Sequence, residues 1–358
     1  MKDPRVLLSF LLGLIFSAVA LYFSFRNVPL YELTTSVMAM DYRWIIASVL
    51  LGLSTYLVRA WRWQIILRPV RKIGFWHAYH PLAIAFMINC ILPGRVGELA
   101  RPAILYKRDD IEFSKTLTTV VAERLFDILI MLALFIFIVG SIKMEPHMVL
   151  TFNGHPINRE TLLAVRGKTL LAGIMLLGLA VAFMLPAVRR SIVHAVSRLP
   201  HLLFFTTSSY RKHLSEVMAL RTHAALDNAS LGFEVFRSPS GILACLVLSV
   251  CIWLITFLSF HVLALGYPGV DITFLQASAV VILTCFFIML PSVPGFWGIW
   301  EIGGIYGLML FGVPKPEAAG LTLTFHVAQI IPLILAGLVS AWMTGTNILR
   351  SYGAGDKG

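Results

Sequence analysis

Long apolar runs recur along the chain and are separated by short polar or basic segments. A helical run of about 18 residues or more is long enough to cross the ~30 Å hydrocarbon core of a bilayer. The runs that we expect to span the membrane are Val6–Phe25, Trp44–Trp61, Thr118–Ile142, Thr169–Leu185, Ile242–Leu265 and Leu321–Thr344. The pattern therefore predicts an all-α polytopic membrane protein, with residues 1–358 forming a single transmembrane domain.

Two further apolar runs are interrupted by proline and glycine. One covers residues 75–106 and breaks at Pro93-Gly94, and the other covers residues 272–311 and breaks at the sequence PSVPG. Each contains Pro-Gly-x-x-Gly followed shortly by a glutamate, Glu98 in the first and Glu301 in the second. Because proline and glycine end helices and allow the chain to reverse, both runs are interpreted as re-entrant helical hairpins and as a weak internal repeat.

The distribution of basic residues favours this topology. If both hairpins return to their own side, the N-terminus and segments 59–72, 107–115 and 189–237 all lie on one side, as the positive-inside rule expects. Full crossings would instead place segment 189–237 opposite segment 59–72. We therefore expect about six spanning helices, two re-entrant hairpins and cytoplasmic termini. The halves at about 44–142 and 242–344 then form an inverted repeat, which is typical of transporters.

The basic segment 189–237 is predicted to be an amphipathic cytoplasmic linker. Its apolar residues Ile192, Val196 and Leu199 share one helical face, and basic residues occupy the others. Such helices lie in the headgroup layer or pack as a pair under the bundle, and the sequence leaves both arrangements open.

Composition supports the membrane assignment. Hydrophobic residues make up 58% of the chain and charged residues 13%, with a mean hydropathy of +0.83. The formal charge of +11 arises from residues at the ends of apolar runs, which fits anionic lipid headgroups better than nucleic acid. The four cysteines lie inside apolar segments without metal-type spacing, so no disulfide is expected. The first apolar run is long for a cleaved signal peptide and is interpreted as a retained helix in the cell (cytoplasmic or inner) membrane.

Charged residues inside the apolar segments are the candidate functional residues. A charge at the bilayer centre costs roughly 2.5–3.5 kcal/mol on insertion scales, so it usually faces a protein interior or a wet cavity. Glu123 and Asp127 are four residues apart and share a helix face, with Arg124 beside them. They form either a polar wall of a substrate cavity or a structural ion-pair cluster, such as Arg124–Asp127 or Glu123–Arg95.

The first hairpin carries the features of an anion site. Its second half-helix is expected to begin at about Arg95 or Val96, with free backbone amides and the positive end of the helix dipole inside the membrane. Arg95 and Arg101 add positive charge, and Glu98 is placed to orient both. Guanidinium groups match phosphate with two-pronged donor geometry. The alternative is a kinked spanning helix whose arginines extend to the interface.

The second hairpin offers a less basic and more aromatic counterpart, with Phe296, Trp297 and Trp300 beside Glu301, and His326 about thirty residues further on. No catalytic residue, metal ion or cofactor is predicted. The predicted substrate-binding residues are Asn89, Arg95, Glu98, Arg101, Glu123, Arg124, Asp127, Trp297, Glu301 and His326.

The motifs LPGRVGELAR, AERLFD and LPSVPGFWGIWE resemble those of the lysylphosphatidylglycerol synthase transmembrane region family, also called flippase-like domain proteins. The resemblance runs over roughly Trp44 to Thr344. It implies movement of a phospholipid or a polyprenyl-phosphate-linked lipid between leaflets. Synthase members carry a further soluble aminoacyl-transfer domain, and this chain, which ends at Gly358, is not expected to make lysyl-lipid.

Three functions remain open from the sequence. The first is a lipid translocase for a lipid with an anionic headgroup, working downhill or by proton coupling through His326 and Glu301. The second is a membrane enzyme acting on a lipid phosphate, and the third is an accessory partner of a lipid synthase or glycosyltransferase. The sequence leaves a homo-oligomer or a complex with a lipid-synthesis enzyme undecided.

Overall fold

The computed structural model describes residues 4–26, 28–92, 95–141, 150–152, 155–157, 159–202, 207–289 and 294–346. The α-helices in these ranges are α1 (Pro4–Phe25), α2 (Leu30–Met38), α3 (Tyr42–Leu67), α4 (Phe75–Ile91), α5 (Gly97–Asp109), α6 (Phe113–Ser141), α7 (Arg159–Met184), α8 (Pro186–Arg198), α9 (Ser208–Gly232), α10 (Pro239–Leu265), α11 (Phe274–Ile288), α12 (Ile299–Met309) and α13 (Lys315–Thr344). Short 3₁₀ turns η1 (Leu199–Leu202), η2 (Glu234–Arg237) and η3 (Pro294–Phe296) and a small antiparallel pair, β1 (Leu150–Phe152) and β2 (His155–Ile157), complete them.

The predicted all-helical membrane fold is confirmed, apart from the β1–β2 pair. Within the described residues, five helices are long and apolar enough to cross a membrane: α3, α6, α7, α10 and α13. They correspond to five of the six predicted spans. The sixth, Val6–Phe25, forms the 22-residue helix α1, and its crossing of the membrane stays a prediction. Helix α2, which follows it, was not predicted.

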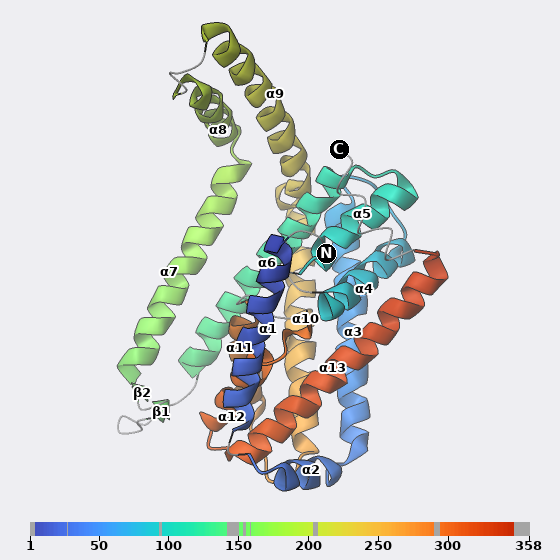
Figure 1. Ribbon diagram of the computed structural model, residues 1–358, viewed down its shortest axis with the longest axis vertical. Helices are drawn as coiled ribbons and strands as arrows, with labels where there is room; N and C mark the ends of the chain where they lie inside the picture. The colour runs from blue at the N-terminus through green and yellow to red at the C-terminus, as the bar shows by residue number, and fades with distance from the viewer. Residues whose placement is uncertain are drawn as a thin grey trace.

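Both interrupted runs form pairs of short helices. Helix α4 contacts α5 and α11 contacts α12, and each pair also packs on α13, through α4 in the first pair and α12 in the second. Figure 1 shows α4–α5 in the upper half of the bundle and α11–α12 in the lower half. Helices α3 and α10 run side by side, α3 against α4 and α10 against α11, and they are joined by a 3.0 Å hydrogen bond between the hydroxyls of Ser48 and Ser259.

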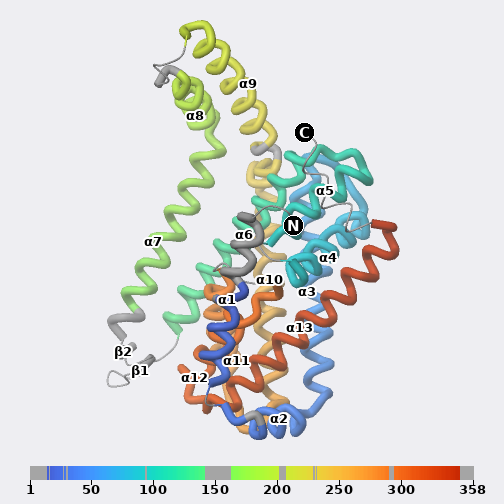
Figure 2. Tube along the Cα trace, viewed as in Figure 1, coloured from blue at the N-terminus to red at the C-terminus, as the bar shows by residue number. Residues whose placement is uncertain are grey.

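The basic segments lie at one end of the molecule. In Figure 2 the end of α3, the α5–α6 connection and the α8–α9 pair all lie at the upper end, to which α13 also rises. Helix α8 has no buried residue among those described, and it packs on α9, which in turn contacts α6. The pair extends beyond the bundle. Its place in the headgroup layer stays a prediction.

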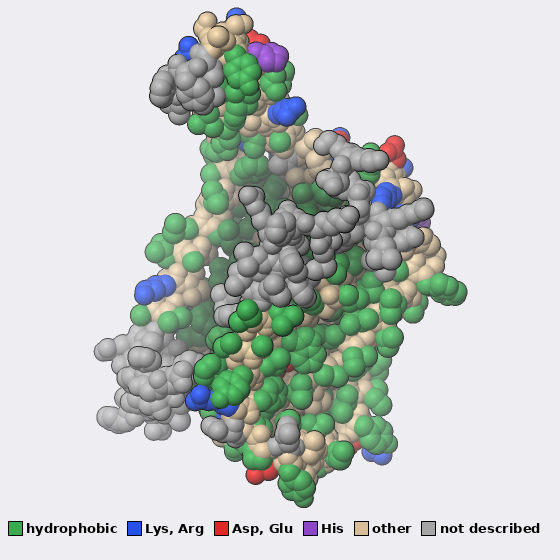
Figure 3. Space-filling view, in the orientation of Figure 1, with side chains coloured by type: hydrophobic (Ala, Val, Ile, Leu, Met, Phe, Trp, Pro, Cys, Tyr) green, Lys and Arg blue, Asp and Glu red, His purple; other side chains and the backbone are tan. Residues whose placement is uncertain are grey.

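Apolar side chains cover the sides of the bundle. Figure 3 shows hydrophobic side chains over the middle of the visible face. Most of the charged groups lie toward the two ends of the molecule. In the apolar part of α7, Leu163–Met184, the most apolar stretch contains no buried residue, and the side chains of Leu170, Ile174 and Leu177 are exposed. Such a surface is suited to lipid hydrocarbon, as expected for a multi-pass membrane protein.

Close approach of backbones determines the shape of the first hairpin. Pro93 and Gly94, the predicted break, lie outside the described residues, but Gly97 stands at the start of α5 against α4. A Cβ on Gly97 would lie 1.9 Å from the carbonyl oxygen of Ala85, so only glycine fits. The second tip turns through left-handed conformations at Gly295, Phe296 and Gly298, and two of these three are glycine.

We predict that Gly97→Ala destabilises the protein by about 1–3 kcal/mol, because the added methyl group overpacks the contact between α4 and α5. Thermal unfolding in detergent measures the loss. Gly167→Ala in α7 is the matched control, since nothing lies within 4 Å of a Cβ there. Equal unfolding temperatures for the two variants would contradict the proposed close contact.

Candidate functional site

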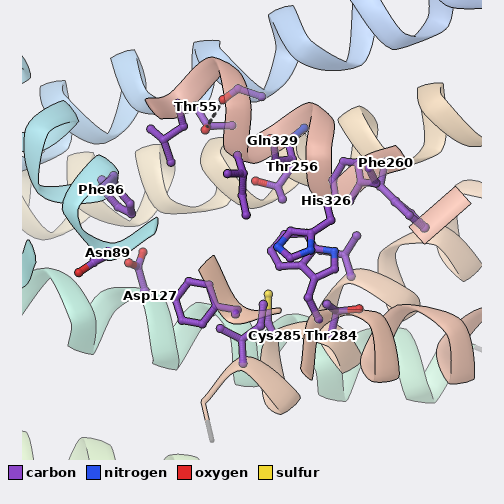
Figure 4. Close-up of a pocket in the computed structure, with 18 of the residues that line it drawn as sticks. Thr55, Phe86, Asn89, Asp127, Thr256, Phe260, Thr284, Cys285, His326 and Gln329 are labelled. Carbon is purple, nitrogen blue, oxygen red and sulfur yellow. Dashed lines mark hydrogen bonds between the residues drawn. The ribbon is translucent and has the colours of Figure 1, made fainter. Parts of the chain in front are cut away.

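A cavity of about 400 Å³ lies between the two hairpins. It is lined by residues of α3, α4, α5, α6, α10, α11, α12 and α13, together with Arg95 and Phe296 at the hairpin tips. In Figure 4, Phe86, Asn89 and Asp127 lie together at one end, and Phe260 and His326 lie toward the other. The two ends differ in chemistry: the first is rich in charged groups, and the second is aromatic.

The charged end is anchored by two carboxylates of α6. Arg62 of α3 donates to Asp127 at 2.6 Å and to Glu123 at 3.2 Å, and Arg101 of α5 donates to Glu123 at 2.6 Å. Arg124 contacts Glu123 at 3.0 Å and Asp127 at 3.3 Å. Glu123, Arg62 and Arg101 are buried. The two carboxylates thus join α3, α5 and α6 through ion pairs, as buried charges require.

Three further ion pairs extend this cluster into the cavity. Arg59 of α3 lies 3.5 Å from Asp127, and Glu98 of α5 lies 3.3 Å from Arg101 and 3.7 Å from Arg124. With Arg95 included, the guanidiniums at this end are Arg59, Arg62, Arg95, Arg101 and Arg124, against the carboxylates Glu98, Glu123 and Asp127. The described groups therefore leave an excess of two positive charges, which favours an anion in the cavity.

Arg95 connects the two hairpins. Its backbone is left-handed, with φ of 55°, and its side chain crosses to donate to the carbonyl oxygen of Ile288 at 2.9 Å. Its guanidinium carbon also lies 5.5 Å from the ring centroid of Phe296. A carbonyl and an aromatic face leave its full charge uncompensated, so Arg95 contributes positive potential where the hairpin tips meet.

The predicted free amides at the start of α5 are not found. The N–H of Gly97 donates to Asn89 Oδ1 at 2.8 Å, and those of Glu98 and Leu99 donate to the carbonyls of Arg95 and Val96. Because these donors already have partners, the helix N-terminus offers them to no anion. The prediction of an amide anion site was wrong in this respect, and the positive charge comes from guanidiniums instead.

The aromatic end is organised around His326 of α13. Its Nδ1 lies 2.5 Å from Glu301 Oε1, and its Nε2 lies 2.8 Å from the carbonyl oxygen of Gly295. The ring of Trp300 stacks on the imidazole, with 4.5 Å between the ring centroids. The ring centroid of Trp297 lies at the same distance from the imidazole, with the two rings tilted by 48°. Because a carbonyl oxygen can only accept, Nε2 is the donor to Gly295, and the second hydrogen bond joins Nδ1 to the Glu301 carboxyl group.

The predicted residues divide into two groups. Those that line the cavity are Asn89, Arg95, Glu98, Arg124, Asp127 and His326. Arg101, Glu123, Trp297 and Glu301 stand behind the wall and hold the lining residues in place. The predicted Arg124–Asp127 pair is present, but Glu123 pairs with other arginines, and Arg95 donates to a carbonyl in place of Glu123 or Glu98.

Arg59 and Arg62 belong to the charged end of the site, although the sequence did not predict them as site residues. They were assigned to a basic loop because the apolar run ends near Trp61, but α3 continues to Leu67 and carries them into the bundle. Their spacing of three places them on one helix face, which was the available signal. Trp253, Thr322 and Gln329 also line the cavity without having been singled out.

Comparison with known proteins identifies a family whose model matches most of the chain. A family model described as "Lysylphosphatidylglycerol synthase TM region" matches residues 10–337, a range that includes both hairpins and every lining residue. No curated protein matches the chain.

We predict that Arg62→Met destabilises the protein by about 3–5 kcal/mol, because it leaves Glu123 and Asp127 short of a buried partner. Unfolding in detergent, followed by temperature or denaturant, measures the change. Arg68→Met, at the exposed end of the same helix, is the matched control. A wild-type stability for Arg62→Met would show that the cluster does not hold α3 to α6.

Proposed function

We propose that this chain, which belongs to the lysylphosphatidylglycerol synthase TM region family, is a lipid translocase that moves an anionic phospholipid or a polyprenyl-phosphate-linked lipid between membrane leaflets. The family and the apolar helices show a multi-pass membrane protein related to lipid metabolism or transport.

The observation that carries the proposal is the surplus of guanidinium groups in a cavity inside the bundle. Arg59, Arg95 and Arg124 line it, and the lining carboxylates Glu98 and Asp127 are engaged in ion pairs. A lipid phosphate matches guanidinium donors in charge and geometry. Its acyl or prenyl chains can remain in the surrounding hydrocarbon while the headgroup occupies the cavity.

The arrangement of the hairpins suggests how the site is exposed to each leaflet. The hairpins lie in opposite halves of the bundle and meet at the cavity. We interpret the halves at about 44–142 and 242–344 as an inverted repeat with six spanning helices, whose rocking opens the cavity to one leaflet and then to the other. The buried hydrogen bond between His326 and Glu301 offers a means of coupling this motion to protons.

The proposed topology places the α5 end and the α8–α9 pair on the cytoplasmic side of the inner membrane. We predict that Lys107→Cys and Arg211→Cys, each in a background without native cysteines, react with an impermeant thiol reagent from the same side. Asp271→Cys, in the exposed α10–α11 connection, is predicted to react from the other side. Labelling of Lys107→Cys and Arg211→Cys from opposite sides would exclude this topology.

Transport is tested in proteoliposomes that contain a fluorescent anionic phospholipid. We predict that the wild-type chain moves the lipid between leaflets chemically unchanged. Arg59→Gln should slow this about tenfold or more, since a hydrogen bond to a charged group contributes ~1.5–3 kcal/mol. Arg68→Gln, outside the cavity on the same helix, should retain the wild-type rate. A chemically altered lipid would favour the enzyme hypothesis, and no movement would favour an accessory role.

A further inference from the structure

Another cavity, of about 390 Å³, lies between α8 and α9 and shares no lining residue with the cavity between the hairpins. Its volume is in the range of small-molecule sites. Along each helix its lining residues recur at spacings of three and four, so each helix presents one face to it. The polar lining residues are Arg189, Arg190, His194 and Ser197 of α8 and His223 and Asp227 of α9.

Positive charge exceeds negative charge in this cavity. Arg189 and Arg190 are permanently charged, and Asp227 is the one carboxylate among the lining residues that the structure describes. Asp227 is divided between two partners, since it lies 3.8 Å from Arg189 and 2.8 Å from His223 Nδ1. Arg190 is exposed and has no ion pair within the described part of the chain. The described groups therefore leave a guanidinium without a counter-charge, which favours an anion.

The cavity lies at the depth of lipid headgroups. Helix α7 is long and apolar enough to cross the membrane and ends at Met184, and α8 begins two residues later, at Pro186. Figure 1 shows α8 at the upper end of α7, beside α9. Because a helix advances 1.5 Å per residue, Arg190 lies within about 6 Å of the start of α8. The headgroup layer is about 5–7 Å thick on each side of the bilayer, so the guanidiniums are placed to meet lipid phosphates.

Two features favour a lipid over a soluble phosphate as the occupant. Leu177 and Val181 on the last turns of α7, and Leu185 between α7 and α8, are exposed apolar side chains against which acyl chains can lie. Residues 186–232 also carry six Lys or Arg against two Asp or Glu. A basic cluster that directly follows a membrane span attracts anionic lipids. A soluble phosphate would use the charges but leave the apolar surface uncovered.

We propose that the cavity between α8 and α9 binds the phosphate headgroup of an anionic lipid from the adjoining leaflet. Arg189 and Arg190 donate to the phosphate oxygens, and a ring N–H of His194 adds a further donor. Helix α8 has no buried residue among those described, so the headgroup would help to hold it against α9. This site is separate from the cavity between the hairpins and does not depend on the proposed function.

The test follows amide hydrogen exchange in α8 and α9 of the full chain, delipidated in non-ionic detergent, because this readout is local to the site. Three additions are compared. Dioleoyl phosphatidylglycerol has a net negative charge and acyl chains, dioleoyl phosphatidylcholine has no net charge, and pyrophosphate has no chains. We expect phosphatidylglycerol to slow exchange in residues 186–198 and 219–227, and the other two to leave it unchanged at the same concentration.

Arg190→Gln removes one donor without breaking an ion pair of the described residues. It should raise the phosphatidylglycerol concentration for half-maximal protection about tenfold or more, because a hydrogen bond between charged groups is lost. Arg198→Gln makes the same change of charge on the same helix, outside the cavity, and should keep the wild-type concentration. Arg59→Gln, in the cavity between the hairpins, should also keep it.

Asp227→Asn separates lipid binding from a structural role of the ion pairs. Its carboxylate competes with the lipid phosphate for Arg189 and His223, so its removal should lower the phosphatidylglycerol concentration for half-maximal protection. If these pairs served only to hold α8 against α9, Asp227→Asn would instead weaken the protection. That result would overturn the proposal.

Three further results would contradict the site. Equal protection by phosphatidylglycerol and phosphatidylcholine, or by none of the three additions, would show that the cavity selects no anionic lipid. Equal protection by pyrophosphate would make a soluble phosphate the occupant. Equal effects of Arg190→Gln and Arg198→Gln would reduce the binding to diffuse attraction by surface charge, and a loss of protection in Arg59→Gln would place it in the cavity between the hairpins.

Discussion

The structure depends on how a bundle surrounded by hydrocarbon accommodates buried charge. Glu123 and Asp127 on α6 receive arginines from α3 and α5, so the pairs that satisfy these charges also fix the helices around them. Breaking such a cluster leaves an uncompensated charge, which is why it holds the first hairpin against the long helices. Because arginines outnumber carboxylates among the described groups, the same cluster leaves positive potential in the cavity, on which the proposed binding of an anionic lipid rests.

The second hairpin is held in a related way. Glu301 on α12 pairs with His326 on α13, while Gly295 and Gly298 of the tip contact the same two side chains. Each hairpin is therefore tied to the long helix that follows it by a buried ionisable pair, Arg101–Glu123 in the first and Glu301–His326 in the second. Arg95 then joins the two tips through Ile288. The cavity lies where these contacts converge.

The positions of the long helices and of both hairpins could be predicted from local sequence features. The proline and glycine interruptions located both hairpins, and the apolar runs located the long helices, since both signals act over a few neighbouring residues. The partners of each charge could not be predicted, because they depend on which helices become neighbours: Arg62 meets Asp127 across 65 positions of the chain. The amides of α5 were expected to be free because Asn89, eight residues away, gave no sign that it would reach Gly97.

The most direct test is a cryo-electron microscopy map of the protein extracted into nanodiscs with its native lipids. We predict density for a lipid phosphate within hydrogen-bonding distance of Arg59, Arg95 or Arg124, with its chains leaving the bundle toward the hydrocarbon. A map in which the cavity holds only water or acyl chains, with every headgroup at the membrane surface, would contradict it.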